Sequence, residues 1–468
     1  MNKWILRLRP LLGMVLLLGA VTQTIAGTDS VTPPPTVSNQ AEPAATSTPT
    51  VSNQAEPVAA SGPAMAAEPA KPTMDLTKGH PTESAPVWSA PENRYTEFLV
   101  DSGAFHVLAA DLSGTGRKDL AFTSHSGDIV RVYRQTAPRQ FVAVDPQDIV
   151  GFHPNDIIVL SNSPKRYLLN AEGAGELRVA EVNAEGRFKQ LAKYPLGNVL
   201  SSTPFSWPGW GPISLAVAPY TGTAITLLRD FNPETAEVKD VLTLPVGRDP
   251  KRVQVVDIDK DGTPELILPS FWDNQIWAIS YAGPDQPPKV QVLASFKRGW
   301  PRQVLPLDVN HDGAMDLLVP MSTRERIAVL LNDGQGHFHE GESIPYPGKT
   351  GIHTLASGKD GEGRYLLAGG SGALVLYRER QNTPGQFETL LAPIQNWPNW
   401  VELVDVDVDG SLDAVIASQD AQESRVIYGP LWKAFSQLAG QPNESKQQES
   451  KQQDATKAAK QASEEEKK

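Results

Sequence analysis

Short apolar runs separated by turn residues fill the middle of this 468-residue chain. The stretch from 302 to 338 shows the pattern. Residues 302–306, 316–320 and 327–331 are rich in apolar and β-branched side chains, and a further run begins at Phe338. Runs of this length bounded by Gly, Asp and Asn are typical of β-strands joined by tight turns. The pattern therefore predicts a structural unit of four strands.

The unit recurs at a regular spacing that is marked by an acidic motif, D-x-[DN]-x-D-G-x-x-[DE]. The motif occupies Asp257–Glu265, Asp308–Asp316 and Asp405–Asp413, so its first residues are separated by 51 and then 97 residues, one step and about two. A weaker relative, Asp111–Asp119, begins 146 residues before the first of these. A repeat of roughly 40–50 residues made of short strands is typical of β-propeller blades.

Filling the gaps at the same period places degenerate members near Ser161, Gly211 and Ser357, which gives seven units. A proline seven residues before the first motif position supports this spacing in five of them. These prolines are Pro154, Pro204, Pro250, Pro301 and Pro398. We therefore predict an all-β fold, a seven-bladed β-propeller over residues 93–435, with six or eight blades as the alternatives.

The last unit has only three expected strands, at residues 400–404, 412–417 and 425–428. The apolar segment 95–100 precedes the first motif and has no unit of its own. Lending this segment to the last blade would close the ring and remove an exposed sheet edge.

The acidic loop followed by Leu317-Leu-Val or Ala414-Val-Ile, together with the phrase 328–338, resembles the FG-GAP/VCBS repeat. Repeats of this kind also build the head of integrin α-subunits. The resemblance spans residues 95–430 and is specific in three or four units. It implies a calcium-stabilised β-propeller. It implies no single activity, because the repeat occurs in adhesins, lectins, lyases and assembly factors.

Each acidic loop offers five oxygen ligands, four from side chains and one from the backbone carbonyl at the seventh position, a set that suits Ca²⁺. The predicted ligands are Asp257, Asp259, Asp261, Thr263 and Glu265; Asp308, Asn310, Asp312, Ala314 and Asp316; and Asp405, Asp407, Asp409, Ser411 and Asp413. In the loop at Asp111, Ser113 and Thr115 replace two acids, so that loop is a weaker candidate. The alternative for all of them is a set of Asx-turns that cap hairpins without metal. The expected role of the ion is structural.

The two ends of the chain are predicted to be appendages. Lys3, Arg7 and Arg9 followed by the apolar run 11–21 are typical of a cleaved signal peptide over residues 1–26. The run is shorter than the roughly 20 residues that span a bilayer, so no transmembrane segment is expected after cleavage. We therefore expect a secreted or periplasmic protein, and secretion of a chain that has acidic calcium-type loops but no cysteine indicates a bacterial one.

Composition separates the arms from the expected ring. Residues 27–92 are rich in Pro, Ala and Thr and predict a disordered linker, and residues 436–468 form a charged Gln/Lys/Glu-rich tail. The chain has no cysteine, which excludes disulfides and thiolate metal sites. The formal net charge is −12, but the three strong loops contain eleven carboxylates, and three Ca²⁺ ions would offset six charges. The charge therefore indicates no cationic partner, and nucleic-acid binding would need a broader basic surface.

A second candidate site lies at the opposite end of the innermost strands. These strands have four to five residues at roughly 3.3 Å each, so the residues before them lie on the face away from the acidic loops. The aromatic and basic candidates there are Trp300, Arg302, Trp397, Trp400, Arg248, Arg252 and Arg298. Aromatic planes could stack on sugar or peptide, and the cations could pair with carboxylate or phosphate. The alternative is packing of the tryptophans between blades, which we expect for Trp272 and Trp277.

No catalytic residue is assigned. The eight histidines are scattered, and no Gly-x-Ser-x-Gly elbow or phosphate-binding glycine loop is present in the sequence. We therefore predict a binding or scaffold module for a polysaccharide or a cell-envelope protein. The alternative is a polysaccharide-active enzyme, a lyase or hydrolase, that works on the face opposite the calcium loops.

Overall fold

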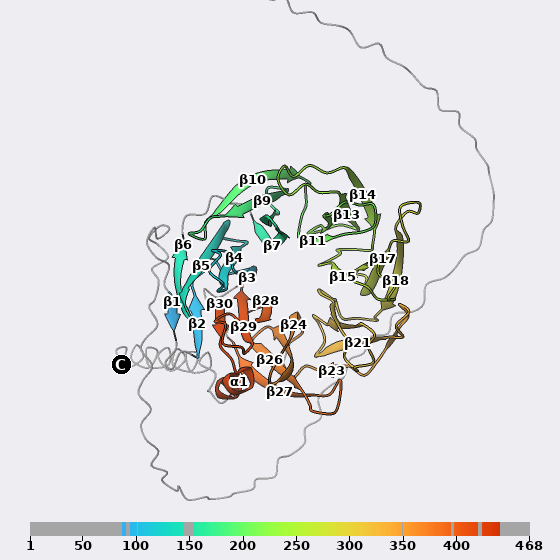
Figure 1. Ribbon diagram of the computed structural model, residues 1–468. Coiled ribbons are helices and arrows are strands. Elements are labelled where there is room, and N and C mark those ends of the chain that lie inside the picture. Colours follow the sequence, from blue (N-terminus) through green and yellow to red (C-terminus); the bar gives the residue numbers. More distant parts are fainter. Residues whose placement is uncertain are drawn as a thin grey trace, which may run out of the picture. The chain divides into compact units, whose positions relative to one another are not determined.

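The computed structural model describes residues 87–89, 94–100, 102–144, 153–348, 350–394, 397–419 and 424–439. The expected signal peptide, nearly all of the expected linker and the tail from residue 440 lie outside the described residues. The described residues form seven antiparallel sheets that follow one another around a ring (Figure 1). The predicted seven-bladed propeller is therefore confirmed.

Six of the blades are built from consecutive strands, numbered here from the innermost strand outward. Blade 1 contains β3 (His106–Ala110), β4 (Asp119–Ser124), β5 (Ile129–Ala137) and β6 (Gln140–Val144). Blade 2 contains β7 (Pro154–Asn162), β8 (Lys165–Ala171), β9 (Glu176–Val182) and β10 (Phe188–Pro195). Blade 3 contains β11 (Ser201–Phe205), β12 (Ser214–Ala218), β13 (Ala224–Arg229) and β14 (Asp240–Pro245).

The next three blades follow the same order. Blade 4 contains β15 (Gln254–Val256), β16 (Glu265–Ser270), β17 (Gln275–Ser280) and β18 (Lys289–Ser295). Blade 5 contains β19 (Leu305–Leu307), β20 (Asp316–Pro320), β21 (Arg326–Asn332), β22 (Phe338–Glu340) and the short β23 (Ile344–Pro345), which also pairs with β21. Blade 6 contains β24 (Ile352–Asp360), β25 (Gly363–Gly370), β26 (Ala373–Glu379) and β27 (Phe387–Pro393).

Blade 7 combines the first two strands of the described chain with the last three. Its inner strands are β28 (Pro398–Val404), β29 (Asp413–Ser418) and β30 (Ser424–Ile427), and its outer strands are β2 (Tyr95–Phe98) and β1 (Val87–Ser89). The pairing of Tyr95 with Ile427 confirms that the first apolar segment closes the ring. Residues 27–92 were expected to be linker throughout, but β1 lies within this range and pairs with β2. The strand was not predicted because its three residues show no alternation of apolar and polar side chains.

The core is divided among the interfaces between blades. Seven clusters of buried apolar side chains each join two neighbouring sheets, and the cluster of Phe98, Phe122 and Val415 joins blade 7 to blade 1. The side chains alternate between the two faces of each strand, so every sheet supplies apolar residues to both of its neighbours. The ring is therefore held together by packing on both sides of every blade.

The three positions that the repeat spacing gave for degenerate motifs can be located relative to the strands. Ser161 lies near the end of β7 and Gly211 lies in the long loop between β11 and β12. Ser357 lies within β24, and the turn that follows comes later, at residues 361–362. The innermost strand of this blade is nine residues long, which moves its turn beyond the position that a fixed period gives.

The helix α1 (Leu431–Ala439) after the last strand was not predicted from the sequence. Its residues Leu431, Ala434 and Phe435 are buried in the cluster between blades 6 and 7, and the Arg378 guanidinium lies 4.1 Å above the Trp432 ring. In the described residues, no helix has the length and apolar character needed to cross a membrane.

The fourth position of each acidic loop has a left-handed backbone. It is Gly114 in blade 1, but Lys260, His311 and Val408 in blades 4, 5 and 7, with φ between 61° and 63°. A β-branched residue is disfavoured in this region because its side chain crowds the backbone. Val408 is 60% exposed, so no packing compensates for that cost.

We predict that Val408→Asn stabilises the protein by about 0.5–1 kcal/mol, because Asn tolerates the left-handed region. Thermal or urea unfolding measures the change. The matched control is Val241→Asn, at an exposed strand position of β14. It should be neutral or destabilising because Val favours extended backbone there. Equal effects of the two substitutions would contradict the assignment of backbone strain to Val408.

Candidate functional site

Four acidic loops connect the innermost strand to the second strand in blades 1, 4, 5 and 7. In each, the first-position carboxylate accepts a hydrogen bond from the N–H of the sixth-position glycine at 2.9–3.1 Å. These glycines have φ between 79° and 90°, the region that glycine enters without steric cost. They are Gly116, Gly262, Gly313 and Gly410. The same bond between the first carboxylate and the glycine N–H therefore closes the loop wherever the motif occurs.

The ninth-position acid begins the second strand and is buried. In blades 1, 5 and 7 its carboxylate accepts the N–H of the residue that lies sixteen positions later. This residue comes two positions after the last one through which the third strand pairs with the second. These bonds are Gln135 to Asp119 (2.8 Å), Asn332 to Asp316 (2.9 Å) and Gly429 to Asp413 (2.8 Å). The other oxygen accepts an N–H from the loop itself, such as Val309 to Asp316. One side chain thus joins the loop to two strands.

Two of the loops bring three carboxylates together. Asp257, Asp259 and Glu265 form one group and Asp405, Asp407 and Asp413 the other, and in each group one oxygen per residue lies within 4.8 Å of the rest. Burial and the charges of the neighbouring carboxylates raise the pKa of Glu265 and of Asp413 to about 7. One buried oxygen in each group, Oδ1 of Asp257 and of Asp407, has no hydrogen-bond partner. These oxygens fit a hard divalent cation.

The Asp308 loop differs because an amide replaces one acid. Asn310 Nδ2 donates to Asp312 Oδ2 at 2.7 Å, so part of the charge is satisfied within the loop. At the seventh position of each strong loop, the N–H of Thr263, Ala314 or Ser411 donates to the fifth-position carboxylate at 2.7–2.8 Å. These Asx-type turns hold the loop shape, and the same geometry leaves side-chain oxygens that a cation could use.

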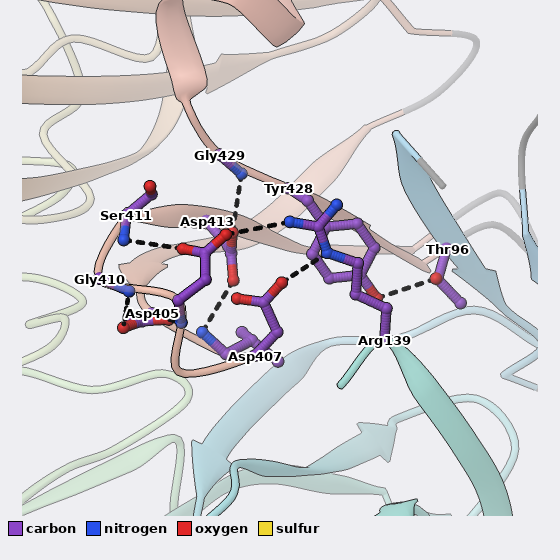
Figure 2. A network of polar contacts seen from close by, with 11 residues as sticks. Thr96, Arg139, Asp405, Asp407, Gly410, Ser411, Asp413, Tyr428 and Gly429 are labelled. Atoms are coloured by element: carbon purple, nitrogen blue, oxygen red, sulfur yellow. Dashed lines mark hydrogen bonds and ion pairs between the residues drawn. The ribbon is translucent and has the colours of Figure 1, made fainter. Parts of the chain in front are cut away.

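In blade 7 an arginine from the neighbouring blade contacts the acidic loop (Figure 2). Arg139, in the turn between β5 and β6, donates from Nε to Asp407 and from Nη2 to Asp409 at 3.1 Å. Its guanidinium also lies 4.5 Å above the Tyr428 ring, and Tyr428 hydrogen-bonds Thr96 of β2 at 2.9 Å. A protein cation therefore balances part of this loop's charge at the interface between blade 1 and blade 7.

On the opposite face the blades surround an axial cavity of about 370 Å³. Its walls come from segments that precede the innermost strands and from the turns between second and third strands, in six blades. Antiparallel strands bring these segments to the end away from the acidic loops. The lining residues are Phe105, His125, Leu200, Tyr220, Thr221, Asp249, Lys251, Arg252, Phe271, Trp272, Arg302, Gln303, His353, Trp397, Asn399, Trp400 and Gln419.

The structure brings four of the seven predicted ligand-face residues into this cavity. They are Arg252, Arg302, Trp397 and Trp400. Arg252 is paired with the buried Asp156 at 2.7 Å, and its guanidinium lies 4.1 Å above the Trp400 ring. Arg252 therefore bridges blades 2, 4 and 7, and its charge is already balanced.

The other three predicted residues lie outside the cavity lining. Trp300 is 39% exposed and packs at the cavity's edge, with its ring centroid 5.1 Å from that of Trp272. Arg248 forms an exposed ion pair with Asp273 at 2.7 Å. Arg298 is an exposed residue between β18 and β19.

Part of the cavity lining was not predicted from the sequence, including His125, Tyr220, Phe271 and His353. It was wrong about Trp272, which is 44% exposed and lines the cavity, because this residue follows β16 in a turn. The adjacent Asp273-Asn274 pair was a turn signal that could have found it. Trp277 lies against the cluster between blades 3 and 4, as expected.

Two cations line the cavity without a salt bridge to any carboxylate in the described part of the chain, although Asp249 and Glu172 attract Lys251 at longer range. No ion pair between Arg302 or Lys251 and a carboxylate occurs among the described residues; Lys251 Nζ instead donates to the Tyr220 carbonyl at 3.2 Å. Burial lowers the pKa of both groups. The Phe271 ring lies 5.3 Å below the Arg302 guanidinium and 5.7 Å from Lys251 Nζ.

The one carboxylate in the lining, that of Asp249, is already hydrogen-bonded. It accepts from Trp272 Nε1 at 2.7 Å and from the Gly222 N–H at 3.0 Å. His353 adds no charge, because burial lowers its pKa to about 3. The cavity therefore has a positive excess and suits an anionic group.

No family model matches the chain, and no curated protein matches it. Among solved structures, BBS1N in complex with ARL6DN, soaked with mercury, is similar with a TM-score of 0.48 and 13% identity, over 70% of this chain and 92% of that one. A putative 6-phosphogluconolactonase from Bacteroides uniformis has a TM-score of 0.48 and 11% identity, over 64% and 89%. These values support no conclusion about function, and the seven-bladed ring follows from the strand pairing itself.

Glu402 lies behind the cavity wall, where it accepts the indole N–H of the lining residue Trp400, and it offers a test by pH. Burial raises its pKa to about 7, although Trp400 Nε1 donates to it at 3.1 Å. The folded state therefore holds this proton more tightly than the unfolded state, and the contribution of Glu402 to stability falls as pH rises from about 4.5 to 7. We predict that Glu402→Gln removes this fall and is more stable than wild type by about 1–3 kcal/mol above pH 7.

Unfolding free energies measured from pH 4 to 9 check this prediction. The matched control is Glu185→Gln, at an exposed turn between β9 and β10, whose profile should follow that of wild type. A Glu402→Gln profile parallel to wild type across the whole range would show that the carboxyl is not perturbed.

Proposed function

We propose that this chain is an exported, calcium-stabilised propeller of the FG-GAP/VCBS type, and that it works as a binding module. Its ligand carries a negative charge and enters the axial cavity. The observation that carries this proposal is the pair of cations, Lys251 and Arg302, that line the cavity beside aromatic rings and form no salt bridge with the described carboxylates. The candidate ligands are a polysaccharide or an acidic segment of a cell-envelope protein. Export rests on the apolar run 11–21 and its basic flank.

The proposed calcium ions have a structural role on the other face. They would be held by the loops at Asp257, Asp308 and Asp405, and in the first and third of these they would neutralise carboxylates that the fold has already brought together. The raised pKa of Glu265 and of Asp413 supports this proposal, because groups that resist ionisation gain most from a bound cation. No ligand would need to touch the ions.

The binding proposal is tested with Arg302→Ala and Lys251→Ala. A charge-assisted hydrogen bond contributes about 1.5–3 kcal/mol, so each substitution should weaken binding of an anionic ligand by roughly 10- to 100-fold. Calorimetry with a panel of uronate oligosaccharides and polyglutamate would measure it. Arg298→Ala is the matched control because Arg298 lies outside the cavity lining. Failure of wild type to bind any anionic probe, or unchanged binding by both cavity variants, would overturn the proposal.

The calcium proposal predicts that chelation lowers the melting temperature. An ion that binds only the folded state contributes about 2.7 kcal/mol per site at 100 times its dissociation constant. Asp259→Asn should reduce this calcium-dependent gain, whereas Asp285→Asn, in the exposed turn between β17 and β18, should not. Melting curves with and without chelator, with elemental analysis of the purified protein, measure both effects. Identical curves with no bound metal would refute the proposal.

A further inference from the structure

In three blades a residue other than glycine has a left-handed backbone at the same position of the blade. His153, Asp249 and Trp300 have φ of 49°, 52° and 52°. Each stands directly before the proline that leads into an innermost strand. In blade 1 the corresponding residue is Gly103, with φ of 79°. Glycine adopts this conformation without steric cost and Asp tolerates it, so His153 and Trp300 are retained at an energetic disadvantage, and such positions concentrate at functional sites.

These side chains gather at the mouth of the axial cavity. The His153 ring centroid lies 4.5 Å from that of His125, and the Asp249 carboxylate accepts the Trp272 indole N–H. The Trp300 ring lies 5.1 Å from Trp272. The unusual backbone at this position therefore directs side chains toward the cavity lining.

Trp300 and Trp272 form an exposed aromatic ledge beside the two unpaired cations. They are 39% and 44% exposed and meet at 69°. Phe271 connects them to the cavity, because its ring lies 5.6 Å from Trp300 and beneath the Arg302 guanidinium. The backbone N–H of Trp300 donates to Asn274 Oδ1 at 2.9 Å, which holds the main chain at this position, and Asp249 accepts the indole N–H of Trp272 at 2.7 Å. The Trp272 ring is thus held by a hydrogen bond and the Trp300 ring by its packing on Trp272 and Phe271, and such preorganisation lowers the cost of binding.

We infer that the cavity and the ledge are two adjacent subsites for an acidic polysaccharide. The inference rests on the proposed function and names its ligand class. The carboxylate of one uronate would pair with Arg302 and Lys251, and the apolar face of the next sugar would lie on the Trp300 indole. Thr221, Asn399 and Gln419 supply neutral polar groups to the lining for sugar hydroxyls. A repeating polymer of rings and carboxylates matches this repeated pairing of aromatic surface with cation.

The test compares uronate oligosaccharides of one and of two or more units on wild type and Trp300→Gly. Wild type should bind the longer oligosaccharides about 10-fold more tightly than the single unit. Trp300→Gly should bind the single unit normally and lose that gain. Its melting temperature should not fall, because glycine accepts the φ of 52°. Asn382→Gly, at an exposed turn with φ of 61°, is the backbone control and should leave all affinities unchanged.

The outcomes separate this inference from the proposed function. If single and longer oligosaccharides bind equally, or if Trp300→Gly keeps the gain, the ledge is not a subsite and the inference is overturned, while anion binding in the cavity still stands. If polyglutamate binds as tightly as the uronates and depends equally on Trp300, the ligand class is wrong. If wild type binds no anionic probe, the proposed function fails as well.

Discussion

Blades 1, 5 and 7 each depend on one carboxylate that is buried where the second strand begins. Asp119, Asp316 and Asp413 each accept one N–H from the preceding loop. The second N–H comes from the third strand in blades 1 and 5, from Gln135 and Asn332, and from Gly429 just after β30 in blade 7. Unpaired buried carboxylates are costly, and here the backbone supplies the donors. Because the same side chain joins three segments of a blade, the loop cannot shift without breaking strand registration. The motif is therefore structural first, and cation binding builds on that arrangement.

The two faces of the propeller use opposite electrostatic arrangements. Acidic oxygens converge on one face, and at the seam Arg139 balances some of their charge from the neighbouring blade. On the other face, Arg302 and Lys251 converge while the carboxylates nearby are occupied by Arg252 or by the Trp272 indole. The short innermost strands separate the two sets of charges along the axis. Each face can therefore attract ions of one sign without quenching the other.

The repeat spacing and the strand patterns were sufficient to predict seven blades and closure by 95–100, because local alternation and turn chemistry determine both. The cavity was only partly predictable. Arg302 and Trp400 were found from their distance to the acidic motif, but Trp272 was missed because spacing does not show which side of a turn faces the axis. Arg139 contacts an acid 268 residues away, and nothing local indicates such a partner. The apolar spacing of α1 was obscured by the charged tail beside it.

Closure by the first strands has a consequence for the order in which the chain folds. During synthesis β2 is made before every strand of blades 1 to 6, but its partner β30 is made after them. Blades can form and pack in succession, whereas the pairing of Tyr95 with Ile427 must close a loop of more than 300 residues. Ring closure is thus a late step of high contact order. Until then β2 has an unpaired edge, and the apolar face of blade 1 around Phe122 lacks its neighbour, so the nascent protein is most prone to association just before completion.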